Sequence, residues 1–188
     1  MSEINDTIQE SMQHASESRV NSIVAIFVAV TATFMAICNI KDGNIVQAMS
    51  QAQAHSIDSW SYFQAKSTKQ SIAANTVEIL KSQKDANEEL IKQNEDQINR
   101  YEKEKAQIKS EAEGFQKEYD DLNVFDDQFD MTEALLSISI ALFGVTALTQ
   151  KKWLLYFCGA LCLTGIIFGL AAFLKISLHS DFISKILG

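Results

Sequence analysis

Residues 20–40 read VNSIVAIFVAVTATFMAICNI and contain no charged side chain. Two further stretches share this property: residues 134–150 read ALLSISIALFGVTALTQ, and residues 153–174 read WLLYFCGALCLTGIIFGLAAFL. A helix needs roughly 20 apolar residues to cross the hydrocarbon core of a bilayer, and the first and third stretches reach this length alone. The second becomes long enough when Glu133 reaches the headgroups at one end and the Lys-Lys pair at 151–152 snorkels at the other.

Two other interpretations of the first stretch fit the sequence less well. A buried helix of a soluble bundle would show a polar stripe, whereas residues 20–40 carry only scattered Ser, Thr, Cys and Asn. A cleaved signal peptide would begin with positive charge, whereas Glu3, Asp6, Glu10 and Glu17 precede the single Arg19. We therefore expect the first stretch to remain as a membrane anchor.

The rest of the chain is predicted to be helical as well. It contains no proline to interrupt a helix and no alternating pattern typical of strands, so the predicted fold class is an all-α integral membrane protein. About 90 residues between the first and second membrane segments must leave the membrane and return to the same face, which two antiparallel helices achieve. The predicted segments are a polar N-terminus 1–19, transmembrane helices 20–40, 131–150 and 151–174, a water-exposed helical hairpin 41–130, and an interfacial amphipathic helix 175–188.

A heptad pattern runs through both halves of the hairpin. Such a pattern is typical of a coiled coil and buries its apolar seam fully only against another helix. In the returning half the positions are Ile91, Asn94, Ile98, Tyr101, Lys105, Ile108, Ala112, Phe115, Tyr119, Leu122, Asp126 and Phe129. In the first half they are Ile45, Met49, Ala52, Phe63, Ala73, Val77 and Leu80, with Ile57 and Trp60 just beside them.

The hairpin is predicted to turn near residues 84–88. Its midpoint lies near Ala86, and Asp85 followed by Glu88 has the form of a capping box. With this turn, antiparallel pairing places Ile57, Trp60 and Phe63 in a packing cluster with Ile108, Ala112 and Phe115. The opposite face, with Tyr62, Lys66 and Lys69, is predicted to be free for a neighbouring subunit, a partner protein or anionic headgroups; simple solvation is the alternative.

Three short stretches resemble a known family. They are WSYFQAKSTKQ at 60–70, YEKEK at 101–105 and LTQKKW at 148–153, and they resemble the bacterial membrane proteins called domain of unknown function 4337. The resemblance spans nearly the whole chain and implies a bacterial membrane setting. It implies no activity, cofactor or catalytic residue.

The sequence predicts no catalytic residue, cofactor or metal site. The three histidines, His14, His55 and His179, lie far apart and lack Cys or His at ligand spacing. Cys158 and Cys162 share a helix face that could suit a soft metal, although small packing residues are the preferred interpretation. A net charge of -8 argues against nucleic acid as a partner, because binding the phosphate backbone needs a basic surface.

Small residues recur at four-residue spacing in the membrane segments, as Ala25 and Ala29, Ala32 and Ala36, and Gly165 and Gly169. Such spacing lets helices approach closely in lipid. It predicts helix contacts within the membrane and favours a homo-oligomer surrounded by lipid. The alternative explanation for any one of these pairs is lipid packing or chance.

Two functions are compatible with these features. The first is a membrane-anchored structural or scaffolding protein that self-associates and presents its hairpin to a protein partner. The second is a passive cation pathway formed by an oligomer in which carboxylates ring the pore mouth; their simpler role is a solvated face near the membrane. These carboxylates are Asp120, Asp121, Asp126, Asp127, Asp130 and Glu133.

The short basic loop at 150–152 predicts the orientation. Short loops rich in lysine stay in the cytoplasm, which places the N-terminus there and the hairpin on the periplasmic side of a bacterial inner membrane. Lys41, Lys175 and Lys185 favour the reverse orientation. Labelling a cysteine at Asn87 in intact cells distinguishes them, because only a periplasmic hairpin reacts with impermeant reagents.

Overall fold

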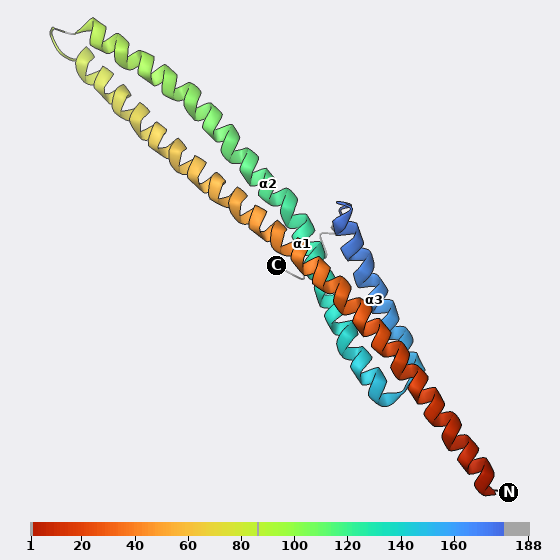
Figure 1. Ribbon diagram of the computed structural model, residues 1–188. Coiled ribbons are helices and arrows are strands. Elements are labelled where there is room, and N and C mark those ends of the chain that lie inside the picture. The colour runs from red at the N-terminus through yellow and green to blue at the C-terminus, as the bar shows by residue number, and fades with distance from the viewer. Residues whose placement is uncertain (1, 86, 179–188) are drawn as a thin grey trace. The chain divides into compact units, whose positions relative to one another are not determined.

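The computed structural model describes residues 2–85 and 87–178, with side chains from Arg19 onward. It contains three helices (Figure 1): α1 at Ser2–Lys81, α2 at Glu88–Thr149 and α3 at Lys152–Phe173. The described residues contain no strand, so the all-α prediction is confirmed. Each helix includes a segment long and apolar enough to cross a membrane, which fits a multi-pass membrane protein. Of the predicted interfacial helix 175–188, residues 179–188 lie outside the described part of the chain.

The chain divides into two compact units. The hairpin unit, residues 47–122, consists of α1 and α2 lying side by side and antiparallel (Figure 1). On α1 its buried residues are Met49, Ala52, Ser56, Lys66, Ala73 and Val77. They belong to one lattice with steps of three and four residues, which we call the buried seam. All the predicted heptad positions of α2 in this unit, from Ile91 to Leu122, are buried or half-buried.

The two helices of the hairpin are joined by residues 82–87. The side chain of Asn87 caps α2, since its Oδ1 accepts a hydrogen bond from the Leu90 backbone N–H at 3.1 Å. The predicted capping box placed this role at Asp85. That assignment is wrong, because α2 begins at Glu88 and the residue directly before it is the one that can reach the first free amides.

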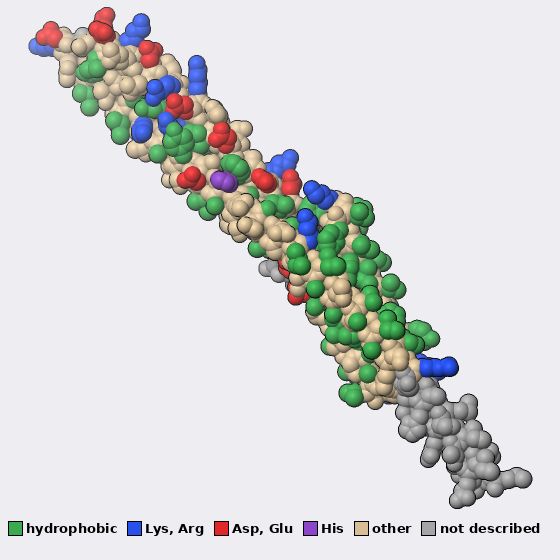
Figure 2. Space-filling model, viewed as in Figure 1, with side chains coloured by type: hydrophobic (Ala, Val, Ile, Leu, Met, Phe, Trp, Pro, Cys, Tyr) green, Lys and Arg blue, Asp and Glu red, His purple; other side chains and the backbone are tan. Residues whose placement is uncertain are grey.

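The membrane unit, residues 1–46 and 123–188, packs one segment of α1 and one of α2 with α3. Figure 2 shows hydrophobic side chains gathered over this unit, whereas charged side chains gather over the hairpin unit. Its core consists of Val20, Val24, Leu136, Phe143, Leu154, Cys158 and Cys162. The buried face of α2 alternates large and hydroxyl side chains: Phe129, Thr132, Leu136, Ser139, Phe143 and Thr146 are each at most 2% exposed.

These buried hydroxyls leave no donor unsatisfied. Thr132, Ser139 and Thr146 each donate to the backbone carbonyl four residues earlier, which is the usual solution for a hydroxyl inside a helix bundle. The small side chains also leave room for α3 to approach. The seven-residue spacing of the three hydroxyls therefore marks the line along which α2 meets its neighbours.

Residues in the left-handed conformation end both α2 and α3. Gln150 (φ 55°) follows α2, and its side-chain Nε2 donates to Asn21 Oδ1 at 2.7 Å, which fastens the α2–α3 connection to α1. Lys175 (φ 55°) follows α3, where the amides of Lys175 and Ile176 bind the carbonyls of Ala172 and Ala171 in the pattern of a Schellman motif. The two left-handed residues therefore bracket α3, which begins at Lys152 and ends at Phe173.

Candidate functional site

Lys66 lies inside the hairpin unit and is the central residue of its polar contacts. Its Nζ atom pairs with Glu104 Oε2 at 2.5 Å, and the Lys66 side chain is 11% exposed. The same ammonium lies 5.1 Å from the centre of the Tyr62 ring and 5.3 Å from that of Tyr101, positions that suit cation–π attraction. The hydrogen bond to Glu104 raises the pKa of Lys66 and lowers that of Glu104, so both groups remain charged.

The prediction that Lys66 lies on a free outer face is therefore wrong. Counting along the buried seam, Lys66 occupies the position between Phe63 and Gln70, and a lysine is accommodated there because Glu104 and two aromatic rings cover it. The neighbouring Tyr62 and Lys69 are exposed as predicted for that face. Lys69 lines a shallow groove with Ile72, Ala73, Thr76, Asn94, Gln97 and Tyr101.

A second polar contact follows one turn further along α1. Lys105 Nζ donates to Gln70 Oε1 at 2.7 Å, and Gln70 Nε2 donates to Glu102 Oε2 at 2.6 Å. The bond from Gln70, followed by the charge of Lys105, lowers the pKa of Glu102. Lys105 also lies 5.3 Å from the centre of the Phe63 ring. The middle of the hairpin is thus held by a layer of hydrogen-bonded charges covered by rings.

The register of the hairpin differs from the predicted one by about one turn. Ser56 Oγ donates to the carbonyl oxygen of Ala112 at 3.3 Å, and His55 stacks on Phe115 with ring centres 5.1 Å apart. Ala112 is fully buried. Small residues on both helices allow this close approach, which places Ala112 and Phe115 one turn away from the predicted Trp60 and Phe63.

The predicted aromatic packing cluster is correspondingly divided. Ile108 and Ala112 are buried and Phe63 is half-buried, but Ile57 is 61% exposed and Trp60 is 37% exposed. Trp60 lies edge-on to Phe63 with ring centres 5.6 Å apart. Placing Ile57 in the hairpin core was wrong, because its neighbour Ser56 occupies the buried position.

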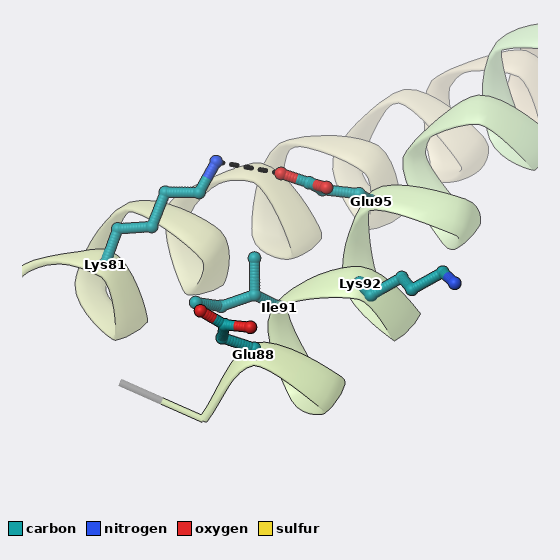
Figure 3. Close-up of a pocket in the computed structure, with 5 residues that line it drawn as sticks. All are labelled: Lys81, Glu88, Ile91, Lys92 and Glu95. Carbon is teal, nitrogen blue, oxygen red and sulfur yellow. Dashed lines mark hydrogen bonds and ion pairs between the residues drawn. The ribbon is translucent and has the colours of Figure 1, made fainter. Parts of the chain in front are cut away.

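At the tip of the hairpin, an open hollow is lined by Lys81, Glu88, Ile91, Lys92 and Glu95 (Figure 3). Lys81 Nζ pairs with Glu95 Oε1 at 2.8 Å across the two helices. Both side chains are about half exposed, and exposed pairs of this kind contribute about 0–1 kcal/mol. The ion pair joins the two helices at this end of the hairpin. The residues that line the hollow do not form an arrangement typical of a reactive site.

A carboxyl cluster forms at one end of the membrane unit. Asp42 of α1 hydrogen-bonds to Asp126 of α2, and the charges of Asp130 and Glu133 act on it as well. Burial, followed by these neighbours, raises the pKa of Asp42 to about 6, and burial also raises the pKa values of Asp126 and Asp130. Asp42 therefore takes up a proton as the pH falls through about 6, and in its protonated form it can donate a hydrogen bond to Asp126.

Asp42 was missed from the sequence, although a signal was present. Asp42 follows Thr31, Met35 and Cys38 and precedes Ile45 in steps of three and four residues. These residues share the inward face of α1, so the spacing indicates that Asp42 is at least partly buried. Two carboxylates of the predicted acidic group belong to the hairpin unit instead: Asp120 accepts a bond from Gln116 at 3.1 Å, and Asp121 is exposed. Asp127 belongs to the membrane unit and acts on Asp126 through its charge.

Stability is expected to fall as pH rises from 5 to 8. Because the pKa of Asp42 rises from 3.8 to about 6 on folding, its contribution is complete below pH 3.8 and is lost as pH rises through about 6. After allowance for partial solvent exposure, this amounts to about 1–2 kcal/mol. Thermal unfolding at pH 5 and 8 tests it: Asp42→Asn should reduce the pH dependence, and the exposed control Asp58→Asn should not. Equal pH dependence in both variants would contradict the assignment.

The thiols of the membrane unit contact hydroxyl groups. Cys162 Sγ lies 3.1 Å from Thr31 Oγ1, and Cys158 Sγ lies 3.6 Å from Thr146 Oγ1. These contacts fit the preferred interpretation of the two cysteines as small packing residues. Among residues whose side chains are described, no group of three or more His, Cys, Asp and Glu is placed to hold a metal ion. His14 and His179 lie outside the described side chains.

The small residues of the membrane helices separate into two groups. Gly165 and Gly169 are buried contacts with α1 and α2 of the same chain: a Cβ at Gly165 would lie 2.8 Å from Leu136 Cδ2, and one at Gly169 would lie 2.9 Å from Phe34 Cε1. The four predicted alanines of α1 are exposed, and one of them, Ala29, lines an apolar groove with Val30, Thr33, Phe34 and Ile37. The exposed alanines are Ala25, Ala29, Ala32 and Ala36.

Comparison with known proteins identifies one family. A family model described as a domain of unknown function (DUF4337) matches residues 20–175. The chain belongs to this family, which the three short stretches had suggested. No curated protein and no solved structure matches it.

Proposed function

We propose that this protein is a membrane-anchored structural protein that self-associates and presents its helical hairpin as a coiled-coil module to protein partners. The observation that carries the proposal is the hairpin unit itself. Its two helices bury a common seam from Met49 to Val77 on α1, and charged and polar contacts fix their register. A pair of long helices with a fixed register suits docking to a partner.

Of the two surfaces expected to support self-association, the alanines of α1 are left uncovered, but the heptad seam of α2 is not. The heptad seam of α2 is covered by α1 of the same chain, so it does not call for a second copy. Self-association is supported by side chains that the chain leaves uncovered. These are the predicted alanines of α1 in the membrane unit and, in addition, Ile57, Trp60, Ile72 and Ile79 in the hairpin unit.

For location, we propose the inner membrane of a bacterium, with the N-terminus in the cytoplasm and the hairpin in the periplasm. The support is the basic pair Lys151 and Lys152, both exposed where the short connection after α2 meets the start of α3. Membrane lipid is then the environment of the apolar side chains of the three crossing segments.

Measuring particle mass in lipid nanodiscs tests the structural proposal. We expect a multiple of the 21.0 kDa chain after subtraction of the disc, at protein concentrations low enough to avoid chance co-insertion. A single chain per disc at every concentration would contradict self-association. Discs assembled with an unrelated protein of three membrane helices provide the control.

A passive cation pathway is the second candidate, and the carboxyl cluster supports it. Asp42 adds a carboxyl to those of Asp126, Asp130 and Glu133 at one end of the membrane unit, and in an oligomer several such clusters would concentrate cations. We expect any conductance in planar bilayers to fall in Asp130→Asn, since Asp130 is exposed. Conductance no higher than that of protein-free bilayers would rule this candidate out.

A further inference from the structure

The outer surface of the hairpin unit is divided into a charged and an uncharged side. Along α2, seventeen of the residues between Glu88 and Asp121 are charged. Along α1, only Asp58, Lys66, Lys69 and Glu78 are charged between Gln47 and Leu80, and Lys66 is buried. Charged side chains are therefore frequent on the hairpin segment of α2 and rare on that of α1.

A second heptad lattice lies next to the buried seam on α1. We call it the outer stripe; it consists of Ser50, Gln53, Ile57, Trp60, Gln64 and Ser67. These residues are exposed, except for the half-buried Ser67, and they span about 25 Å of helix at 1.5 Å per residue. Ile57 and Trp60 form its apolar centre. A helix with two adjacent heptad lattices can pack against two neighbours, and α2 covers only one of them.

We propose that the outer stripe pairs with the outer stripe of a second copy, parallel and in register. This inference rests on the proposed self-association and identifies its contact surface. Copies inserted in one membrane share their orientation, so a two-fold axis along the membrane normal makes equivalent helices run in the same direction relative to the membrane. In such a pair, the residues nearest the axis face their own counterparts.

The charge distribution selects a second copy as the occupant. In an in-register pair, any charged residue on the stripe would oppose an identical charge, and the outer stripe has none. A partner of different sequence is normally selected by complementary charges at the flanking heptad positions, and anionic headgroups require cations. The stripe offers neither. Pairing through α2 would instead bring many like charges together, which is costly.

Disulfide cross-linking in native membranes tests the assignment. Gln53→Cys and Gln64→Cys should each cross-link to their own counterpart at least about fivefold more than Gln107→Cys, an exposed control on α2. The native Cys38, Cys158 and Cys162 are buried and stay in place, so the unmodified chain gives the background. Cross-linking that is equal at all three positions would overturn the assignment.

Charge exchange at Ile57 distinguishes a second copy from another partner. Ile57→Glu is expected to reduce the associated fraction about tenfold, because like charges then oppose each other. Co-expression of differently tagged Ile57→Glu and Ile57→Lys chains is expected to restore association between the two. The control Ala106→Glu, on the exposed side of α2, should leave it unchanged. Failure of the mixed pair to associate overturns the pairing.

The two proposals fail in distinguishable ways. Finding a single chain in every nanodisc would contradict the proposed self-association and, with it, the outer-stripe contact. An oligomer that persists in Ile57→Glu and shows no cross-linking preference for the stripe leaves self-association in place and overturns only the contact surface.

Discussion

Replacing Gly169 with valine is expected to lower the thermal unfolding temperature in detergent by roughly 5–10 °C. A Cβ at this position would lie 2.9 Å from Phe34 Cε1 and 3.1 Å from Thr132 Cγ2. Thr132 is fully buried, and its hydroxyl is bonded to the Gln128 carbonyl. The larger side chain must therefore push α3 away from both other helices, and overfilling a packed core costs about 1–3 kcal/mol or more.

Gly165→Val should have a similar effect, since its Cβ would lie 2.8 Å from Leu136 Cδ2 and 3.2 Å from Leu135 Cβ. The matched control is Gly159→Val in the same helix, where an added Cβ meets no atom within 4 Å. We expect Gly159→Val to unfold within about 2 °C of the parent, as substitutions away from packed contacts usually do. Equal losses at positions 159 and 169 would show that glycine packing does not hold α3.

The glycine contacts also show how much of the packing between the membrane helices can be predicted from the sequence. The spacing of Gly165 and Gly169 correctly indicated a helix face that is approached closely, but a spacing does not identify the partner. The same pattern at Ala25 and Ala29 lies on the uncovered side of α1. Whether a small-residue face meets the same chain or another surface depends on the rotation of each helix within the bundle, which a local pattern does not fix.

Asp42 shows a different limit. Because it lies beside Lys41 at the end of an apolar stretch, its sequence position suggests a residue exposed among the lipid headgroups. Its partial burial and its hydrogen bond to Asp126 require that Asp42 on α1 lies opposite Asp126 on α2. In the sequence, the whole hairpin separates these two residues. A long-range pairing of this kind cannot be read from either segment alone.

In the hairpin, α2 was predictable because its seam is apolar and regular. On α1 the same reasoning failed between Ile57 and Lys66, since the aromatic and aliphatic side chains there suggested a core face. Of the predicted residues, Phe63 is packed inside, and the other inner positions belong to Ser56 and Lys66. Apolar character predicts burial on average, but small residues at a close helix contact and a covered ion pair override it.

The covered ion pair leads to the second large expected effect. Glu104→Gln is expected to lower the unfolding temperature of the protein by roughly 5 °C, whereas Lys66→Met should stay within about 2 °C of the parent. Removing the carboxylate leaves the Lys66 ammonium beneath two rings, with its side chain only 11% exposed. An uncompensated buried charge is strongly destabilising.

Removing the lysine has a different consequence. Methionine fills nearly the same volume on the buried seam, and the Glu104 side chain that remains is 33% exposed, so water can solvate its carboxylate. The variant loses the ion pair but leaves no charge trapped in an apolar site. Replacement of a buried pair by well-packed apolar groups is often neutral or stabilising.

The double variant Lys66→Met with Glu104→Gln separates these terms. If the trapped ammonium causes the loss in Glu104→Gln, then removing it as well restores the unfolding temperature toward that of the parent. The exposed pair Lys81 and Glu95 supplies the control, since Glu95→Gln at a half-exposed contact should change little. Suppose instead that the double variant has an unfolding temperature no higher than that of Glu104→Gln, and that Lys66→Met lowers the unfolding temperature by as much as Glu104→Gln does. The attraction between the two charges would then itself stabilise the hairpin. In that case Lys66 is a stabilising member of the seam, and the desolvation argument fails.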